Sequence, residues 1–237
     1  MSHVLLINPN TSARTLSAML AAARPWLPPG LDLAGVHAAA VPAMIVTDDA
    51  LRDAVPEVVR LGLAGAAQAT AIVVAAFGDP GVAELRGRLA IPVAGIGESA
   101  ILEGAAPARR FSIVTTTPGL CPAIAAMARR LTAPTRFAGV RVTPGDPLDL
   151  AADPARQLAA LAEAVRACIE IDGAEAVVVG GGPLSDTAAS LRAAFGAAIV
   201  EPVPAAIRRL VRSGRLTPPA NGECPGRTDP SRTSPPP

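Results

Sequence analysis

Short runs of apolar residues alternate with longer segments of helical periodicity along most of this chain, and this alternation restricts the possible folds more than any other feature. Two of the runs, Ala71–Ala76 and Ala176–Gly180, contain only alanine, valine, isoleucine and one glycine. Uninterrupted apolar runs of this length are typical of parallel strands that are buried on both faces. The sequence therefore predicts an α/β fold built from doubly wound parallel sheets.

The alternation restarts near residue 110, so we expect two similar lobes with the functional site in the cleft between them. The first lobe is expected to span residues 1–110 and the second residues 111–216, with the C-terminal helix able to return to the first lobe. The predicted strands are His3–Asn8, Leu31–His37, Ala71–Ala76, Ile91–Ala94, Phe111–Thr115, Phe137–Val142, Ala176–Gly180 and Ala198–Val200. The predicted helices are Ser12–Ala23, Asp48–Gln68, Gly97–Ala105, Gly119–Leu131, Pro154–Ile171, Ser185–Phe195 and Pro204–Arg212.

Composition argues against several classes of function. A net charge of +1 gives no electrostatic footprint for nucleic acid or an anionic membrane. An aromatic content of 2% leaves few side chains that could stack on bases. No apolar run reaches the length of a membrane span, and the amino terminus enters a strand without the features of a signal peptide. We expect a cytoplasmic homo-oligomer whose partner is a small molecule.

The last segment, residues 217–237, differs from the rest of the chain because it is rich in proline, serine and threonine. Such a segment has too few apolar residues to order itself, so we expect a disordered tail. A short proline-rich ligand for another protein is the alternative interpretation.

The ends of the two apolar runs are the strongest candidates for a site. Phe77–Gly81 follows the first run and Gly181–Leu184 follows the second. In open α/β folds the carboxyl ends of the strands line the ligand crevice. Neither junction carries, at its tip, a side chain that could move a proton or attack carbon.

Two polar segments lie at equivalent positions. Asn8–Ser12 follows the first strand and opens a helix, and Thr115–Gly119 does the same after the fifth strand. Free backbone N–H groups at a helix start attract anions such as carboxylates, whereas the simpler interpretation is a capped helix. Two such segments at strand ends strengthen the first interpretation, because the fold brings those ends together.

The other motifs give weaker evidence of a functional site. Gly95–Ala100 fits G-x-G-x-x-A, but no acidic residue follows about twenty residues later to bind a ribose, so we interpret the match as chance. The two histidines, His3 and His37, and the three cysteines show no metal-type spacing, so we expect no metal site. Asp79 precedes Pro80 and is expected to lie in a turn that starts a helix.

Three segments taken together resemble a known family. Leu5–Ser12, Phe77–Gly81 and Val114–Thr117 are similar to the hydantoin racemase branch of the aspartate/glutamate racemase superfamily, and the likeness covers most of residues 3 to 213. The resemblance implies a two-lobed racemase or epimerase that needs no cofactor. It implies a substrate that is a small amino-acid-derived carboxylate or a cyclic ureide of the hydantoin or allantoin type. In this family one cysteine removes a proton and a second returns it from the opposite face.

The resemblance also locates the two proton carriers. They correspond to Ala76 and Gly181, so both thiols are missing from this chain. Cys121 lies near a helix start, Cys168 lies in a helix with an apolar face, and Cys224 lies in the tail. These cysteines do not form an opposed pair in the predicted fold.

Three hypotheses follow: racemisation with substitute groups, another reaction in the same cleft, or ligand binding without conversion. Asp79 and Ser185 are the candidate substitutes for the thiols. Glu201 is expected either to face the cleft or to lie at a helix start. The predicted substrate-binding residues are Asn10, Thr11, Phe77, Gly78, Thr116, Thr117 and Gly182.

Overall fold

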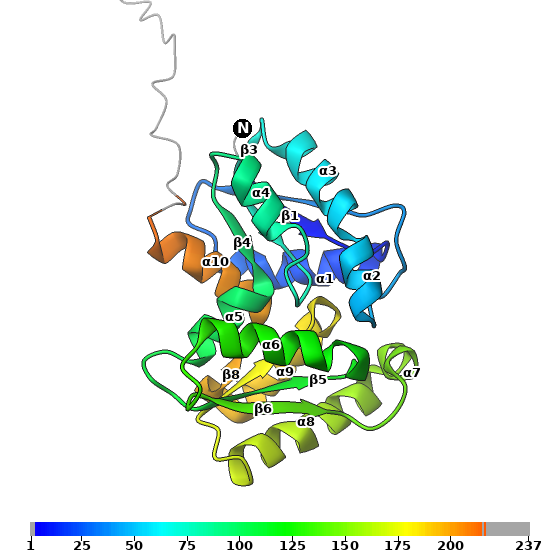
Figure 1. Ribbon diagram of the computed structural model, residues 1–237, viewed down its shortest axis with the longest axis vertical. Coiled ribbons are helices and arrows are strands. Elements are labelled where there is room, and N and C mark those ends of the chain that lie inside the picture. Colours follow the sequence, from blue (N-terminus) through cyan, green and yellow to red (C-terminus); the bar gives the residue numbers. More distant parts are fainter. Residues whose placement is uncertain (1–2, 215, 217–237) are drawn as a thin grey trace, which may run out of the picture.

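The computed structural model describes residues 3–214 and 216, and its strands form two four-stranded parallel sheets. The strand order of the first sheet is β2 (Asp32–His37), β1 (His3–Asn8), β3 (Ala69–Val74) and β4 (Val93–Gly95). That of the second is β6 (Phe137–Val142), β5 (Phe111–Thr115), β7 (Ala176–Val179) and β8 (Ile199–Val200). The two sheets, stacked along the long axis of Figure 1, confirm the predicted α/β fold.

Ten α-helices among the described residues surround these sheets. The helices of the first half are α1 (Ala13–Ala23), α2 (Asp48–Asp53), α3 (Val55–Gly65), α4 (Val82–Arg88) and α5 (Ile96–Gly104). Those of the second half are α6 (Cys121–Leu131), α7 (Pro147–Ala152), α8 (Pro154–Glu170), α9 (Ser185–Phe195) and α10 (Pro202–Arg212). No helix among residues 3–214 and 216 is long and apolar enough to cross a lipid bilayer.

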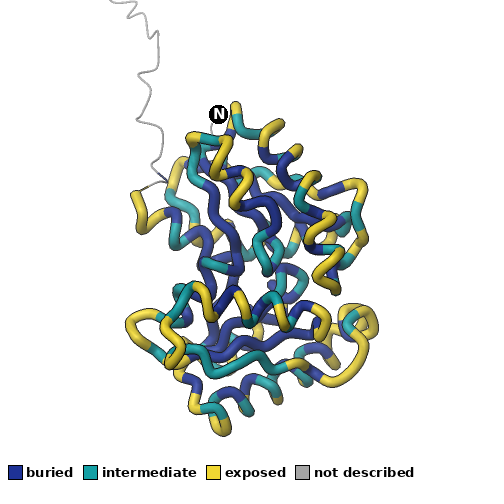
Figure 2. Tube along the Cα trace, in the orientation of Figure 1, coloured by how far each residue is buried: buried dark blue, intermediate teal, exposed yellow. Residues whose placement is uncertain are grey.

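Both faces of the first sheet are covered, which explains the continuous apolar runs. On β3, Ala71 and Val73 face α1 and α10, whereas Ile72 and Val74 face α3 and α4. The side chains of a strand point alternately to opposite faces, so a strand covered on both sides is apolar at every position. Figure 2 shows the result as central strands that are buried along most of their length beneath partly exposed helices.

Two helices pack across the division between the halves of the chain. Helix α5 follows β4, yet its Ala100 and Ile101 belong to the core of the second sheet, with Phe111 and Val178. Helix α10 follows β8, yet its Ile207 belongs to the core of the first sheet. The two helices also contact each other extensively. The sheets are therefore connected by packed helices as well as by the chain itself (Figure 1).

Candidate functional site

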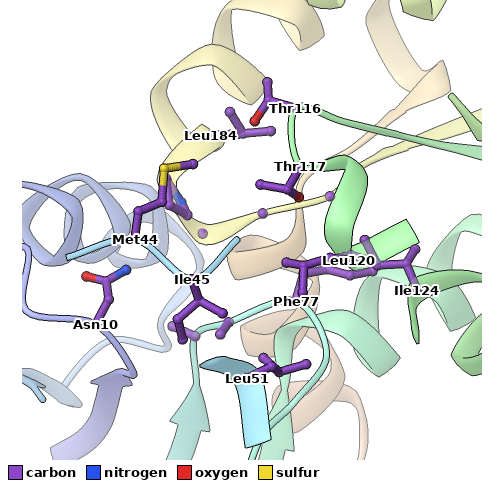
Figure 3. Close-up of a pocket in the computed structure, with 16 residues that line it drawn as sticks. Asn10, Met44, Ile45, Leu51, Phe77, Thr116, Thr117, Leu120, Ile124 and Leu184 are labelled. Atoms are coloured by element: carbon purple, nitrogen blue, oxygen red, sulfur yellow. The ribbon is translucent and has the colours of Figure 1, made fainter. Parts of the chain in front are cut away.

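A cavity of about 40 Å³ lies where the carboxyl ends of β1, β3, β5 and β7 converge between the two sheets (Figure 3). This volume corresponds to about three water molecules. The walls come from the ends of strands in both sheets and from the segment between β2 and α2. The lining residues are Asn10, Met44, Ile45, Leu51, Ala75, Ala76, Phe77, Thr116, Thr117, Leu120, Ile124, Gly180, Gly181, Gly182, Pro183 and Leu184.

The two apolar-run junctions meet in this cavity. Ala76 and Gly181 both line it, although they are far apart in the sequence. A Cβ atom at Gly182 would lie 2.7 Å from the Ala75 carbonyl oxygen and 2.8 Å from the Met19 sulfur. Only glycine permits this approach of the second junction to the first. The two strand ends were expected to converge, and in the structure their backbones are in direct contact.

Asn10 presents a hydrogen-bond donor to the cavity. Its Oδ1 accepts hydrogen bonds from Asn8 Nδ2 (2.8 Å) and from the Ser12 backbone N–H (2.9 Å). With the oxygen engaged in this way, the Nδ2 group is the part of the amide left for a ligand, and the residue is only 5% exposed. A ligand atom that meets Asn10 is therefore expected to be an acceptor.

The threonine segment after β5 supplies hydroxyl groups from the second sheet. The Thr117 hydroxyl is 2.9 Å from that of Thr115, which ties it to the strand end. Thr116 also lines the cavity, is 1% exposed, and makes no side-chain hydrogen bond to any other described residue. The Thr116 hydroxyl is thus available to a ligand. Figure 3 shows Thr116 and Thr117 on the opposite side of the cavity from Asn10.

Backbone groups complete the polar lining. The structure records no hydrogen bond from the N–H groups of Phe77, Gly181 or Gly182 to another described residue. Amide groups without a protein acceptor are available to an acceptor atom of a ligand, and burying them without one costs free energy. Together with Asn10 and Thr116, they form a set of donors suited to carboxylate or carbonyl oxygens.

The segment of residues 38–47, between β2 and α2, covers the cavity. Its Met44 and Ile45 line the cavity, and in the view of Figure 3 they lie between Asn10 and Thr117. The segment approaches the second half of the chain so closely that a Cβ atom at Gly119 would lie 2.5 Å from the Val46 carbonyl oxygen. This covering segment was missed by the sequence reasoning because it has neither periodicity nor a motif.

Several predicted site residues lie outside the lining. Thr11 and Gly78 are neighbours in sequence of lining residues but do not line the cavity themselves. Ser185 is buried at the start of α9, where its hydroxyl donates to the Gly182 carbonyl oxygen at 2.7 Å. The hydroxyl is therefore held in a local turn. Pro183 and Leu184 line the cavity as part of the predicted second junction, and the other lining residues that were not predicted are Leu51, Ala75, Leu120, Ile124 and Gly180.

Asp79 lies in the turn that leads into α4, as expected, but its side chain contacts a different helix. Its carboxylate accepts hydrogen bonds from the backbone N–H groups of Gly97 and Glu98, both at 2.7 Å, at the start of α5. Burial raises the pKa of Asp79 to about 7, although the two amide groups and Arg86 oppose the rise. Asp79 is not among the residues that line the cavity. The carboxylate thus acts as the N-terminal cap of α5.

This cap gives the G-x-G-x-x-A motif a structural reason. A Cβ atom at Gly95 would lie 2.1 Å from the Asp79 carboxyl carbon, and one at Gly97 would lie 3.1 Å from Asp79 Oδ1. The glycines therefore make room for a carboxylate from the same chain. The start of α5, where a dinucleotide phosphate would lie in the motif's usual setting, is occupied by Asp79.

None of the side chains that line the cavity ionises near neutral pH. Cys121 lies outside the lining, its Sγ is 3.7 Å from the Thr117 carbonyl oxygen, and burial raises its pKa. Burial also raises the pKa of Cys168 to about 11. Glu201 is 7% exposed and is 3.4 Å from Arg192. Cys224 lies outside the described residues.

Comparison with known proteins is informative over nearly the whole chain. A family model described as Asp/Glu/Hydantoin racemase matches residues 4–210. A hydantoin racemase of Paenarthrobacter aurescens is 29% identical over 226 residues, which cover 92% of this chain and 95% of that protein. A hydantoin racemase of Rhizobium meliloti is 31% identical, with 87% and 86% covered. The structure of an allantoin racemase from Klebsiella pneumoniae superposes with a TM-score of 0.83 at 28% identity, covering 90% of this chain and 89% of that one.

Proposed function

The chain belongs to the Asp/Glu/hydantoin racemase family, and from this premise we propose that it is an isomerase acting without a cofactor on a small cyclic ureide or amino-acid-derived carboxylate. The relatives that it resembles are named for hydantoin and allantoin. The observation that carries the proposal is the donor set of the cavity, formed by Asn10 Nδ2, the Thr116 hydroxyl and free backbone N–H groups.

The donor set fits the electronic demand of such a reaction. Removing a proton from a carbon next to a carbonyl group moves negative charge onto the carbonyl oxygen. Donors that are already oriented toward that oxygen stabilise the charge, and they are worth more in a dry cavity than in water. Asn10 is oriented by its own hydrogen bonds, so its NH₂ group does not reorganise when the charge develops. In this proposal Asn10 and Thr116 bind the oxygen atoms of the ligand.

A second function, binding without conversion, is favoured by one specific observation. Ala76 and Gly181, the two positions that the family resemblance assigns to thiols, end in the cavity without an acid or a base. A general base has to reach the proton that it removes, either directly or through one water molecule. With no ionisable side chain in the lining, the retained donors support recognition of the ligand more directly than they support proton transfer.

One experiment separates the two functions. Single enantiomers of 5-methylhydantoin, allantoin and representative amino acids are incubated with the protein in D₂O, and exchange of the carbon-bound proton is followed by NMR. Thermal denaturation with each compound reports binding. Exchange together with stabilisation supports the isomerase, and stabilisation without exchange above the protein-free rate supports binding alone. If no compound raises the melting temperature and none exchanges, the proposal is wrong.

The cellular setting rests on the sequence. We propose a cytoplasmic location for the protein and its self-association into a homo-oligomer. Fractionation and sedimentation of the protein at several concentrations test these two proposals.

A further inference from the structure

A second cavity adjoins the one already described. It has a volume of about 270 Å³ and shares Met44 and Pro183 with the smaller cavity, so these two side chains form the wall between them. We call the smaller cavity the inner chamber and the larger one the outer chamber. The outer chamber lies between α1 and the starts of α8 and α9. Its polar lining includes Arg14, Thr15, Gln157, Asp186 and Thr187.

Gln157 is the most informative residue of the outer chamber. It is only 6% exposed, although it lies near the start of α8 and is a polar residue in a helix that otherwise buries Leu161, Val165 and Cys168. Its Oε1 accepts a hydrogen bond from the Thr187 hydroxyl at 2.8 Å, and Thr187 is itself 7% exposed. No described residue accepts a hydrogen bond from its Nε2 group. An amide whose oxygen is engaged and whose NH₂ group has no protein acceptor leaves that group available as a donor to a ligand.

The same arrangement occurs in the inner chamber. There the Asn10 oxygen is engaged by Ser12 and Asn8, which leaves the NH₂ group for a ligand. Each chamber thus contains one buried carboxamide that is oriented as a donor by neighbouring groups. A single ligand that satisfies both has an acceptor oxygen at each end.

The rim of the outer chamber adds groups of both charges. Arg14 comes from the first turn of α1 and Asp186 from the first turn of α9, and both are exposed. Neither forms an ion pair with another residue in the described part of the chain. A guanidinium group donates hydrogen bonds and a carboxylate accepts them, so the pair complements a group that has both a carbonyl oxygen and N–H groups.

The volumes of the two chambers also favour a single ligand that occupies both of them. The inner chamber has room for about three water molecules, which is less than a cyclic ureide needs. Met44 is unbranched and flexible, so the wall that it forms with Pro183 is the part able to yield when a ligand enters. Displacing Met44 joins the two chambers into one continuous site.

We propose that the outer chamber is a specificity subsite that binds a ureido or carboxamide substituent of the ligand, with Gln157 as the principal donor and Thr187 as its positioning residue. The reacting carbon and its carbonyl group lie in the inner chamber. This inference rests on the function proposed above, and it adds the chemical nature of the substituent. The residues that select the substituent, Gln157 and Thr187, therefore lie outside the two apolar-run junctions.

The test compares two ligands that differ in this substituent. Allantoin carries a ureido group at the ring carbon where 5-methylhydantoin carries a methyl group. The double variant Gln157→Met/Thr187→Val removes the amide and the hydroxyl together and keeps their approximate shapes, which avoids leaving one buried polar group unpaired. Calorimetry is expected to show about a tenfold loss of affinity for allantoin and less than a twofold change for 5-methylhydantoin. The matched control, Gln68→Met, changes an exposed glutamine elsewhere and is expected to change neither affinity.

A second variant keeps the test decisive if the double variant does not fold. Arg14→Met changes an exposed side chain, and we expect it to weaken allantoin binding about threefold without affecting 5-methylhydantoin. If the unmodified chain binds both ligands and the folded variants weaken both equally or neither, the subsite is refuted while the proposed function stands. If the unmodified chain binds neither ligand, the proposed function fails and the subsite fails with it.

Discussion

Introducing thiols at Ala76 and Gly181, the two positions that the family resemblance assigns to proton carriers, tests the assignment of the reaction centre most directly. The variant Ala76→Cys/Gly181→Cys introduces one thiol at the end of each apolar-run junction. Both positions line the inner chamber, so each new side chain starts from its wall. Thiols next to free backbone N–H groups have a lowered pKa, and here Phe77, Gly181 and Gly182 supply such groups.

The structural cost of the two substitutions is unequal. A Cβ atom at Gly181 would lie 3.5 and 3.6 Å from atoms of Leu184, which is ordinary contact, so space is available. The backbone is less favourable, because Gly181 has φ +148° and ψ 135°. Strain of this kind costs about 1–3 kcal/mol. For a chain of this length it lowers the melting temperature by about 5 °C. Ala76→Cys replaces a residue that already has a Cβ, so we expect a smaller cost.

The assay is exchange of the proton at the ring carbon in D₂O, with each enantiomer of 5-methylhydantoin followed separately. Positioned acid–base groups contribute about 10²- to 10⁴-fold, so we expect the double variant to exchange at least about 100-fold faster than the unmodified chain. Each single variant has one proton carrier and is expected to accelerate exchange chiefly for one enantiomer, without interconverting the two. Interconversion needs both thiols.

Three results would refute this reasoning. The first is a double variant that is folded and binds the ligand but exchanges no faster than the unmodified chain. The second is an unmodified chain that already exchanges as fast as the double variant, because the proton carriers then lie elsewhere. The third is equal acceleration by the variant Ala76→Ser/Gly181→Ser, because the acceleration would then not depend on a thiol.

Three further predictions concern the supporting structure. Burial raises the pKa of Asp79 to about 7, so the folded chain keeps a proton that the unfolded chain loses near pH 4. The free energy of unfolding therefore falls as the pH rises from about 4 to about 7. Asp79→Asn is expected to remove this fall, as measured by denaturant titrations at several pH values. Gly119→Ala adds a Cβ atom 2.5 Å from the Val46 carbonyl oxygen and is expected to weaken ligand binding about tenfold in calorimetry by displacing the covering segment. Arg208→Ala removes a guanidinium that is 2.6 Å from Glu103, and we expect a loss of about 2 kcal/mol in thermal unfolding.

Each of these has a contrary outcome. If the stability of the Asp79→Asn variant falls as steeply with rising pH as that of the unmodified chain, another group is responsible for the pH dependence. A Gly119→Ala variant with full affinity would show that the covering segment yields without cost to the ligand. For Arg208, the control is Arg208→Lys, which keeps the charge but cannot form the bidentate contact. Equal stability of Arg208→Lys and the unmodified chain would contradict the importance of that geometry.

The central strands were predictable because burial on both faces leaves a direct trace in the sequence. His3–Asn8 and Phe111–Thr115, which are buried along nearly their whole length, have the predicted bounds, and so does the half-buried edge strand Phe137–Val142. Short helices left no such trace. Helix α4 has seven residues and α7 has six, which is too few for a period of 3.6 to be recognised. The single helix predicted over Asp48–Gln68 is two helices, and Pro56 lies in the first turn of the second one.

The packing of α5 on the second sheet was not predicted from the sequence, whereas the C-terminal helix was expected to be able to return to the first lobe. Both helices have apolar faces that suit either sheet, and periodicity does not say which sheet a face will cover. The role of Asp79 was hidden for a similar reason. Its partners, Gly97 and Glu98, are 18 and 19 residues away and are backbone groups, which have no signature in the sequence.

The candidate site was predictable in part, because strand ends converge in this architecture and because the family resemblance named the residues at those ends. Asn10, Phe77, Thr116, Thr117 and Gly182 line the inner chamber. The covering segment and the outer chamber were not predictable. They depend on where a segment without periodicity lies in space, and on a hydrogen bond between residues 157 and 187 that only the folded chain brings together.

Recognition and proton transfer make separate demands on a site, and this chain meets them unequally. Recognition of an oxygen atom needs donors held in place, and the backbone turns and the Asn8–Asn10 network provide them without any ionisable side chain. Proton transfer needs a titratable atom at the reacting carbon, and positions 76 and 181 supply only a methyl group and a hydrogen atom. The backbone donors do not depend on the side chains at these two positions, so affinity for a ligand does not require a thiol at either of them. The two properties are therefore expected to separate in experiment, with Asn10→Ala abolishing binding and Ala76→Cys/Gly181→Cys altering the rate of exchange.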